Sequence, residues 1–294
     1  MRLPIKYLTL ATATVLISFT PSLLPISSQL APLTAQAQTA KDQRSKASEL
    51  FNKGYEQYQR GQYQESLETL QQSLAIFTQI GDRSGEAAVL SRIGRVYDAL
   101  NQYDQALKVY QKALGITREL GERWEEGIVL DYIGRIYELQ GQNQKALEFQ
   151  QQALAIFQEV GNRRSESIVL GNIGMIYQKL GQDDKALETY QETLKVVREI
   201  GERQGEGVIL DYIGVSYNNQ GKYDQALESH QKALAIFREL GAPRSEAIVL
   251  RNLGLVYQNL GQKQKAQETL QQAMEIFQKL GDQQAVSAIR REIQ

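Results

Sequence analysis

The chain has no cysteine, one histidine and one tryptophan among its 294 residues. Without cysteine it can form no disulfide, no thiolate metal site and no cysteine nucleophile. A single histidine leaves little for most metal centres or for Ser–His catalysis. We therefore predict that the protein is not an enzyme, with no catalytic or metal-binding residues and no cofactor.

The charges are nearly balanced, which bears on the kind of partner. Lys and Arg total 33 against 34 Asp and Glu, a net charge of −1. Proteins that bind nucleic acids gather a basic excess that neutralises phosphate groups. We therefore predict no nucleic-acid partner.

Residues 1–37 differ in composition from the rest of the chain. They hold four of the five prolines and no acidic residue. The segment opens on Arg2 and Lys6, continues through the apolar run Tyr7–Phe19 and ends in the small-residue sequence Ala35-Gln36-Ala37. A basic start, an apolar centre and an A-x-A end are typical of a secretory signal peptide.

This pattern predicts cleavage after Ala37, export to the periplasm or the cell exterior, and a flexible leader over residues 38–46. An uncleaved membrane anchor stays an alternative. The apolar run is shorter than the roughly 20 residues that cross a bilayer as a helix. Once the leader is removed we expect no contact with a membrane.

The remainder of the chain repeats with a fixed step of forty residues. The motif [Ile/Leu]-Gly-x-x-Tyr occurs five times, beginning at Ile93, Ile133, Ile173, Ile213 and Leu253. A second series of glycines keeps the same spacing at Gly81, Gly121, Gly161, Gly201, Gly241 and Gly281. A fixed period of this length indicates a repeat architecture.

Each period is predicted to form two helices. Leu90, Ile93 and Tyr97 recur at helical spacing, which places them on one face. Gly or Asn stands where each helix should end, and these residues enter the left-handed conformation most easily. In the second repeat we predict helices over residues 83–100 and 104–120. The array would comprise six pairs over 47–282 and a capping helix over 283–294.

The glycine inside the first helix of each repeat needs its own explanation, because an interior helical glycine costs about 1 kcal/mol relative to alanine. A small residue follows twelve positions later, as Ser66 follows Gly54 and Ala106 follows Gly94. We predict that these two positions face each other and let the paired helices approach closely. One pair cannot bury its apolar face alone, so neighbouring pairs must stack.

This pattern resembles the tetratricopeptide repeat. The signature positions are occupied by Leu90, Ile93, Gly94, Tyr97, Ala106, Tyr110 and Ala113. The period of forty and the missing closing proline are similar to the longer variety found in G-protein-modulator scaffolds and kinesin light chains, and to exported bacterial arrays. The resemblance implies an all-α fold, a right-handed solenoid of antiparallel helix pairs.

The resemblance also implies that a peptide or protein partner binds the concave face, which the first helix of each pair lines. Residues beside the apolar stripe are the predicted peptide-binding positions: Arg92, Arg95, Asp131, Tyr132, Arg135, Asn172, Asp211, Tyr212, Arg251 and Asn252. Asn can bind a peptide backbone of any sequence, and Arg binds carboxylates through two hydrogen bonds. The other interpretation is that these residues form only a solvated face.

Three alternatives stay open at this point. The predicted function is a non-catalytic interaction scaffold, and the alternative is a self-assembling array, a homo-oligomer without a peptide ligand. His230 is expected to pack between helices rather than act as a general base. Trp124 is expected to be exposed, either as a binding anchor or as edge packing.

Overall fold

The computed structural model describes residues 26–293, with side chains from residue 38 onward. The run Tyr7–Phe19 lies outside the described residues. Within them the chain forms thirteen helices and no strand, which confirms the predicted all-α solenoid. The helices are α1 (Ile26–Gln59), α2 (Tyr63–Gln79), α3 (Arg83–Ala99), α4 (Tyr103–Leu120), α5 (Arg123–Leu139), α6 (Asn143–Glu159), α7 (Arg163–Lys179), α8 (Asp183–Glu199), α9 (Arg203–Asn219), α10 (Tyr223–Glu239), α11 (Pro243–Asn259), α12 (Lys263–Lys279) and α13 (Gln283–Ile293).

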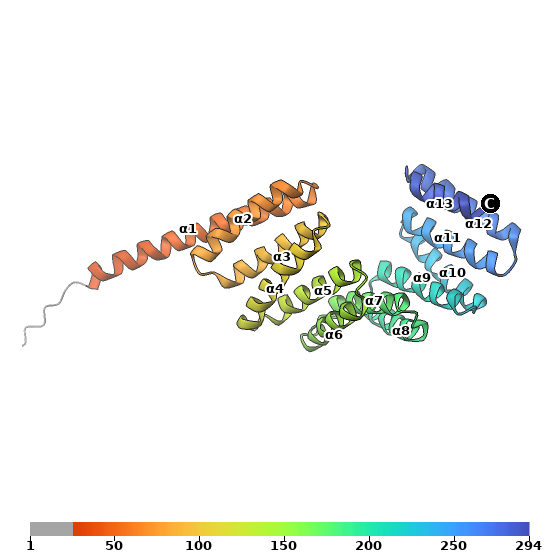
Figure 1. Cartoon of the computed structure of the whole chain (residues 1–294), viewed down its shortest axis with the longest axis horizontal. Helices are drawn as coiled ribbons and strands as arrows, with labels where there is room; N and C mark the ends of the chain where they lie inside the picture. Colours follow the sequence, from red (N-terminus) through yellow and green to blue (C-terminus); the bar gives the residue numbers. More distant parts are fainter. Residues whose placement is uncertain (1–25, 294) are drawn as a thin grey trace, which may run out of the picture.

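Each helix packs mainly against the helices before and after it, as expected of a solenoid. Figure 1 shows the pairs stacked into a curved array. The odd-numbered helices lie on the inner side of the curve and the even-numbered helices on the outer side. The inner helices of neighbouring repeats also touch one another, as α3 and α5 do.

The helix ends follow the stereochemistry of glycine. Gly121 closes α4 with a left-handed φ of 69°, and Asn101 takes the same role after α3 with φ 56°. The N–H of Glu122 then donates to the carbonyl of Thr117. This hydrogen bond satisfies one of the carbonyl groups that have no partner within the helix. The two helices predicted for this repeat therefore end within one residue of their expected positions.

The glycine inside each inner helix forms a notch for one side chain of the next helix. A Cβ added at Gly94 would lie 2.4 Å from Cε1 of Tyr110. The small residue twelve positions on does lie nearby, since the Ser66 hydroxyl donates to the Gly54 carbonyl at 2.7 Å. The side chain that requires the glycine, however, stands sixteen positions on. Across the array these side chains are Leu70, Tyr110, Gln150, Tyr190, His230 and Leu270.

A ladder of ion pairs follows the edge where the inner helices begin. Arg203, at the start of α9, contacts Glu206 at 2.7 Å and Glu239, at the end of α10, at 2.8 Å. Arg198, at the end of α8, reaches Glu206 at 2.8 Å and so joins one repeat to the next. Related contacts recur at Arg83, Arg123 and Arg163. The ladder thus links neighbouring repeats along this edge.

The first helix is longer than the others. Residues 38–46, expected as a flexible leader, belong to α1 in the structure. Their side chains are mostly exposed, and Ala47 is the first fully buried one. Figure 1 shows the beginning of α1 projecting beyond α2. Among residues 26–293, no helix combines the length and hydropathy needed to cross a bilayer.

Candidate binding surface on the inner side of the array

The ten predicted peptide-binding residues all lie on odd-numbered helices, which line the inner side of the curve. Arg92 and Arg95 lie on α3, and Asp131, Tyr132 and Arg135 on α5. Asn172 lies on α7, Asp211 and Tyr212 on α9, and Arg251 and Asn252 on α11. Arg135 is exposed, Asp211 is buried, and the others are half-buried.

Four of these residues bind each other across two repeat junctions. Asn172 donates to Oδ1 of Asp131 at 3.0 Å, and Gln150 donates to the same oxygen at 2.9 Å. Burial raises the pKa of Asp131, and the hydrogen bond from Gln150 acts against that shift. The carboxylate and the amide that were predicted to meet a peptide are therefore engaged within the chain.

The same arrangement recurs eighty residues later. Asn252 donates to Oδ2 of Asp211 at 3.0 Å, and Nδ1 of His230 lies 2.7 Å from Oδ1 of Asp211. His230 is only 1% exposed, and its ring fills the notch at Gly214. The geometry fits the packing role expected of this histidine, since solvent has almost no access to the ring.

Two further predicted residues form ion pairs within the chain. Arg251 binds the carboxylate of Glu292 in α13, with Nε 2.9 and 3.0 Å from its two oxygens. Arg135 lies 3.4 Å from the Asp98 carboxylate. Burial raises the pKa of Asp98, while the positive charges of Arg135 and Arg95 oppose the shift.

The remaining residues surround two hollows between inner helices. Each hollow lies at a junction where two tyrosine rings meet, Tyr110 with Tyr132 and Tyr190 with Tyr212, both with ring centroids 5.4 Å apart. The cationic hollow is lined by Phe51, Ala88, Ser91, Arg92, Arg95, Trp124, Glu125, Ile128 and Tyr132. The apolar hollow is lined by Arg164, Ser167, Ile168, Gly171, Asn172, Met175, Thr193, Val197, Glu202, Gln204, Gly205, Val208, Ile209 and Tyr212.

The cationic hollow has a volume of about 250 Å³ between α1, α3 and α5. Its arginines lie over aromatic rings, Arg92 at 4.2 Å from the ring centre of Tyr55 and Arg95 at 5.1 Å from that of Tyr58. Such contacts between a guanidinium and a ring face are favourable. Trp124 stands at the opening with 46% of its surface exposed.

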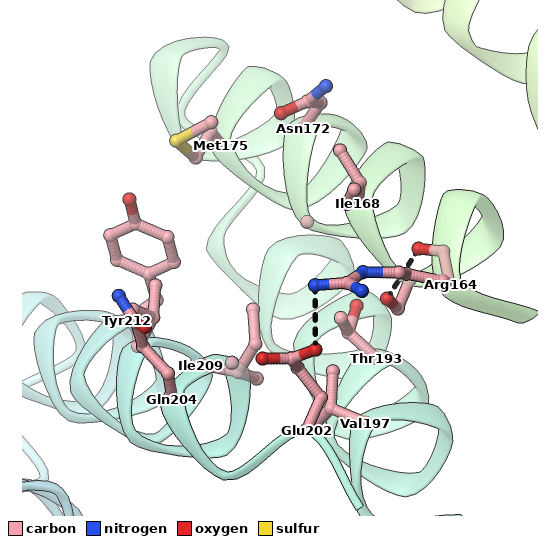
Figure 2. A pocket seen from close by; sticks show the side chains of 14 residues that line it. Arg164, Ile168, Asn172, Met175, Thr193, Val197, Glu202, Gln204, Ile209 and Tyr212 are labelled. Carbon is pink, nitrogen blue, oxygen red and sulfur yellow. Dashed lines mark hydrogen bonds and ion pairs between the residues drawn. The ribbon is translucent and has the colours of Figure 1, made fainter. Parts of the chain in front are cut away.

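The apolar hollow has a volume of about 430 Å³ between α7 and α9, with α8 behind it. Figure 2 shows Ile168 and Met175 on one wall and Ile209 and Tyr212 on the other. Gly171 has no side chain at this point, where other inner helices carry Phe51, Ser91, Asp131, Asp211 or Arg251. The ion pair between Arg164 and Glu202, 3.1 Å long, bridges the two helices.

The two hollows occupy equivalent places eighty residues apart. Tyr132 corresponds to Tyr212, while Arg92 and Arg95 correspond to Asn172 and Met175. Sequence reasoning missed Ile168, which is 55% exposed. A signal was present, because Ile168 precedes Asn172 by four positions and therefore shares its helix face. Among the side chains that the structure describes, no group of three or more His, Cys, Asp or Glu residues is placed to hold a metal ion.

Comparison with known proteins identifies the repeat. The model of the family described as "Tetratricopeptide repeat" matches residues 57–119, 125–199 and 206–279. The chain belongs to the tetratricopeptide-repeat family. Tetratricopeptide arrays bind protein partners, so this chain has the architecture of a protein-interaction scaffold. A search of curated proteins gives no match.

Solved structures share the fold of this tetratricopeptide array. BtubC (BKLC) from P. vanneervenii is 21% identical with a TM-score of 0.61, over 82% of this chain and 92% of that one. Aspartyl phosphate phosphatase F from Bacillus subtilis is 14% identical with a TM-score of 0.67, over 92% and 74%. A Rap protein complexed with Competence and Sporulation Factor is 15% identical with a TM-score of 0.60, over 84% and 74%. At these identities the likeness concerns the fold alone.

Proposed function

We propose that this tetratricopeptide array is a non-catalytic scaffold that binds an extended polypeptide segment along its inner side. The apolar hollow is the observation that carries the proposal. It is large enough for an amino-acid side chain, and Ile168 exposes apolar surface in it. Apolar surface that gathers in a concave site favours a binding role. One structure of the same fold was solved with a bound factor, which is consistent with this use of the fold.

The proposal is tested by selecting peptides from a displayed random library on the purified chain. We expect the selected peptides to share an aliphatic or aromatic residue that enters the apolar hollow. Ile168→Glu places a charge in the apolar wall of the hollow and should weaken binding at least about tenfold. Lys195→Glu adds twice as much negative charge on the outer helix α8, away from the hollow, and should leave affinity unaltered.

Recovery of no peptide above background would refute a peptide-binding role. Equal loss of affinity in the Ile168→Glu and Lys195→Glu variants would place the binding surface elsewhere on the array.

A second candidate function is self-assembly, favoured by a row of aliphatic side chains along one edge. Each stands at the C-terminal end of an outer helix or directly after it, and is exposed by 37–44%: Leu120, Val160, Ile200, Leu240 and Leu280. Two copies that paired through this edge would bury the row. Mass measured by sedimentation over a hundredfold range of concentration decides the point, because a constant monomer mass excludes this function.

We also propose that the chain is exported and cleaved after Ala37, on the pattern of residues 1–37. In the whole chain this position lies within α1, ahead of Ala47, which is the first fully buried residue from residue 38 onward. Cleavage there would leave the contacts between α1 and α2 from Ala47 onward intact. N-terminal sequencing of the exported protein should begin at Gln38, and a product that begins at Met1 would contradict cleavage.

A further inference from the structure

Most cations on the inner helices have an acidic partner. Arg135 lies 3.4 Å from Asp98, and Lys179 lies 2.7 Å from Glu138. Arg251 binds Glu292 through several hydrogen bonds. These side chains neutralise one another, so they offer little net attraction to a charged ligand.

Arg92 and Arg95 are different. Neither forms an ion pair with any of the residues that the structure describes. Nε of Arg92 is buried without a hydrogen-bond partner. Glu125 also lines the cationic hollow, but it is exposed and makes no ion pair with either arginine. Asp98 is near enough to feel the charge of Arg95, yet it forms its ion pair with Arg135.

The two guanidinium groups also repel each other. Burial lowers the pKa of Arg92, and the positive charge of Arg95 lowers it further. Arginine nevertheless keeps its charge at neutral pH. The hollow thus holds two positive charges, one of them with an unused buried donor. An anion that enters it would accept hydrogen bonds and relieve the repulsion.

The walls of the cationic hollow place a second requirement on the ligand. Trp124 and Ile128 present apolar surface beside the arginines, and the volume of about 250 Å³ fits one side chain. The inner side continues past this point through α5 and α7, so a bound chain can pass through the hollow rather than end there. Lysine and arginine side chains of a ligand would be repelled.

We infer that the cationic hollow binds the carboxylate of an Asp or Glu side chain within the polypeptide segment, with Arg92 and Arg95 as its hydrogen-bond donors. The inference rests on the proposed function. It adds that the ligand is bipartite: an acidic residue at the junction of α3 and α5, and an apolar residue at the equivalent junction of α7 and α9.

The test uses peptides selected from the displayed library on the full chain. The tightest peptide is remade with each acidic residue changed to its amide, and separately with an amidated C-terminus. Affinity is measured by fluorescence anisotropy on wild type and on the Arg92→Met/Arg95→Met variant. Trp124, the only tryptophan, reports occupancy of the hollow by its own fluorescence.

We expect one acid-to-amide change to weaken binding to the wild type about tenfold or more. The same change should alter affinity for the double variant less than about twofold, because the arginines that read the charge are gone. Trp124 fluorescence should respond to the acidic peptide in the wild type. Lys112→Met, which removes an exposed cation from the outer helix α4, is the control and should keep the tenfold discrimination.

Three outcomes would overturn the inference. Selected peptides without an enriched acidic residue would remove its basis, while the proposed peptide-binding function would stand. An equal effect of the acid-to-amide change on wild type and double variant would show that the arginines do not contact the carboxylate. Loss of binding on C-terminal amidation alone would assign the hollow to a terminal carboxylate instead. Circular dichroism checks folding, and single Arg95→Gln substitutes for the double variant if that variant unfolds.

Discussion

The notch at each inner-helix glycine is the residue-scale feature on which helix pairing depends. Cβ at Gly94 would meet the ring of Tyr110 at 2.4 Å, far below a normal van der Waals distance. Gly115, in α4, offers a contrast, because nothing lies within 4 Å of an added Cβ and its backbone is helical. The same substitution therefore has opposite consequences at the two positions.

Gly94→Ala should lower the free energy of unfolding by about 1–3 kcal/mol, since Tyr110 is buried and cannot retreat. Gly115→Ala should raise it by about 0.5–1 kcal/mol, because alanine favours the helix and nothing obstructs its methyl group. Urea unfolding followed by circular dichroism measures both. Similar effects of the two substitutions on the free energy of unfolding would refute the claim that Tyr110 requires a glycine at position 94.

The half-buried Asp131 at the junction of α5 and α7 predicts a pH dependence. Burial raises the folded-state pKa of Asp131 above its unfolded value. The folded state therefore binds this proton more tightly, and ionisation of Asp131 costs stability as pH rises through the folded pKa. Asp131→Asn removes this cost and its pH dependence.

We expect the difference in the free energy of unfolding between wild type and Asp131→Asn to change with pH. Relative to the variant, the wild type should gain stability as pH falls from 7 toward the unfolded pKa. Urea unfolding of both proteins at several pH values measures the difference. A difference that is constant with pH, or that moves in the opposite direction, would contradict the raised pKa.

At the scale of helices, the ends of the array differ from its middle. α13 packs against α12 and has no outer helix of its own among the described residues. Val286 and Ile289 are buried, at 2% and 0% exposure, and Arg251 binds Glu292 from α11. Because each repeat contacts only its neighbours, damage here should stay local.

Ile289→Ala removes buried methyl groups from α13, and such changes cost about 2–5 kcal/mol where the structure cannot collapse. We expect faster amide hydrogen exchange in α12 and α13, with α5–α8 unaltered. Ile136→Ala, near the end of the central helix α5 and equally buried, is the matched control and should increase exchange in the central helices. Uniform acceleration after Ile289→Ala would indicate one global cooperative unit.

How far the sequence predicts the helices and the site depends on the range of the interactions. The helix ends near residues 100 and 120 were predictable, because a left-handed Gly or Asn is a local requirement. The face that holds Arg92 and Asn172 was also predictable, because spacing fixes direction on a helix. That Asp131 binds Asn172, and that Arg92 lies over aromatic rings without an acidic partner, depends on how two repeats stack. A sequence pattern within one repeat does not determine the distances between side chains of two stacked repeats.

At the scale of the whole molecule, two kinds of junction alternate along the four repeat junctions from α4 to α11. Tyr110 meets Tyr132, and Tyr190 meets Tyr212, at the junctions that hold the hollows. The junction that follows each of these is joined by an Asp–Asn hydrogen bond. The unit of the array is therefore eighty residues, two repeats, although the backbone repeats every forty.

Deletion of whole repeats tests this unit. A chain without residues 121–200 brings Tyr110 against Tyr212, which restores a tyrosine pair worth about 0.5–1.5 kcal/mol. A chain without 121–160 brings Tyr110 against Asn172 and leaves that amide without Asp131. We expect the shorter chain to unfold at an equal or higher urea concentration than the longer one. Lower stability of the eighty-residue deletion would show that all junctions are interchangeable.

This alternation separates two demands that evolution places on the protein. Interfaces joined by an acid and an amide stabilise the array, whereas interfaces with paired phenol rings leave space for a ligand. If the ligand's sequence changes, substitutions at positions such as Arg95 and Met175 can restore binding without weakening the neighbouring interfaces. A protein engineer who wishes to change the ligand can accordingly substitute residues at the interfaces with tyrosine pairs and keep the Asp–Asn interfaces unchanged.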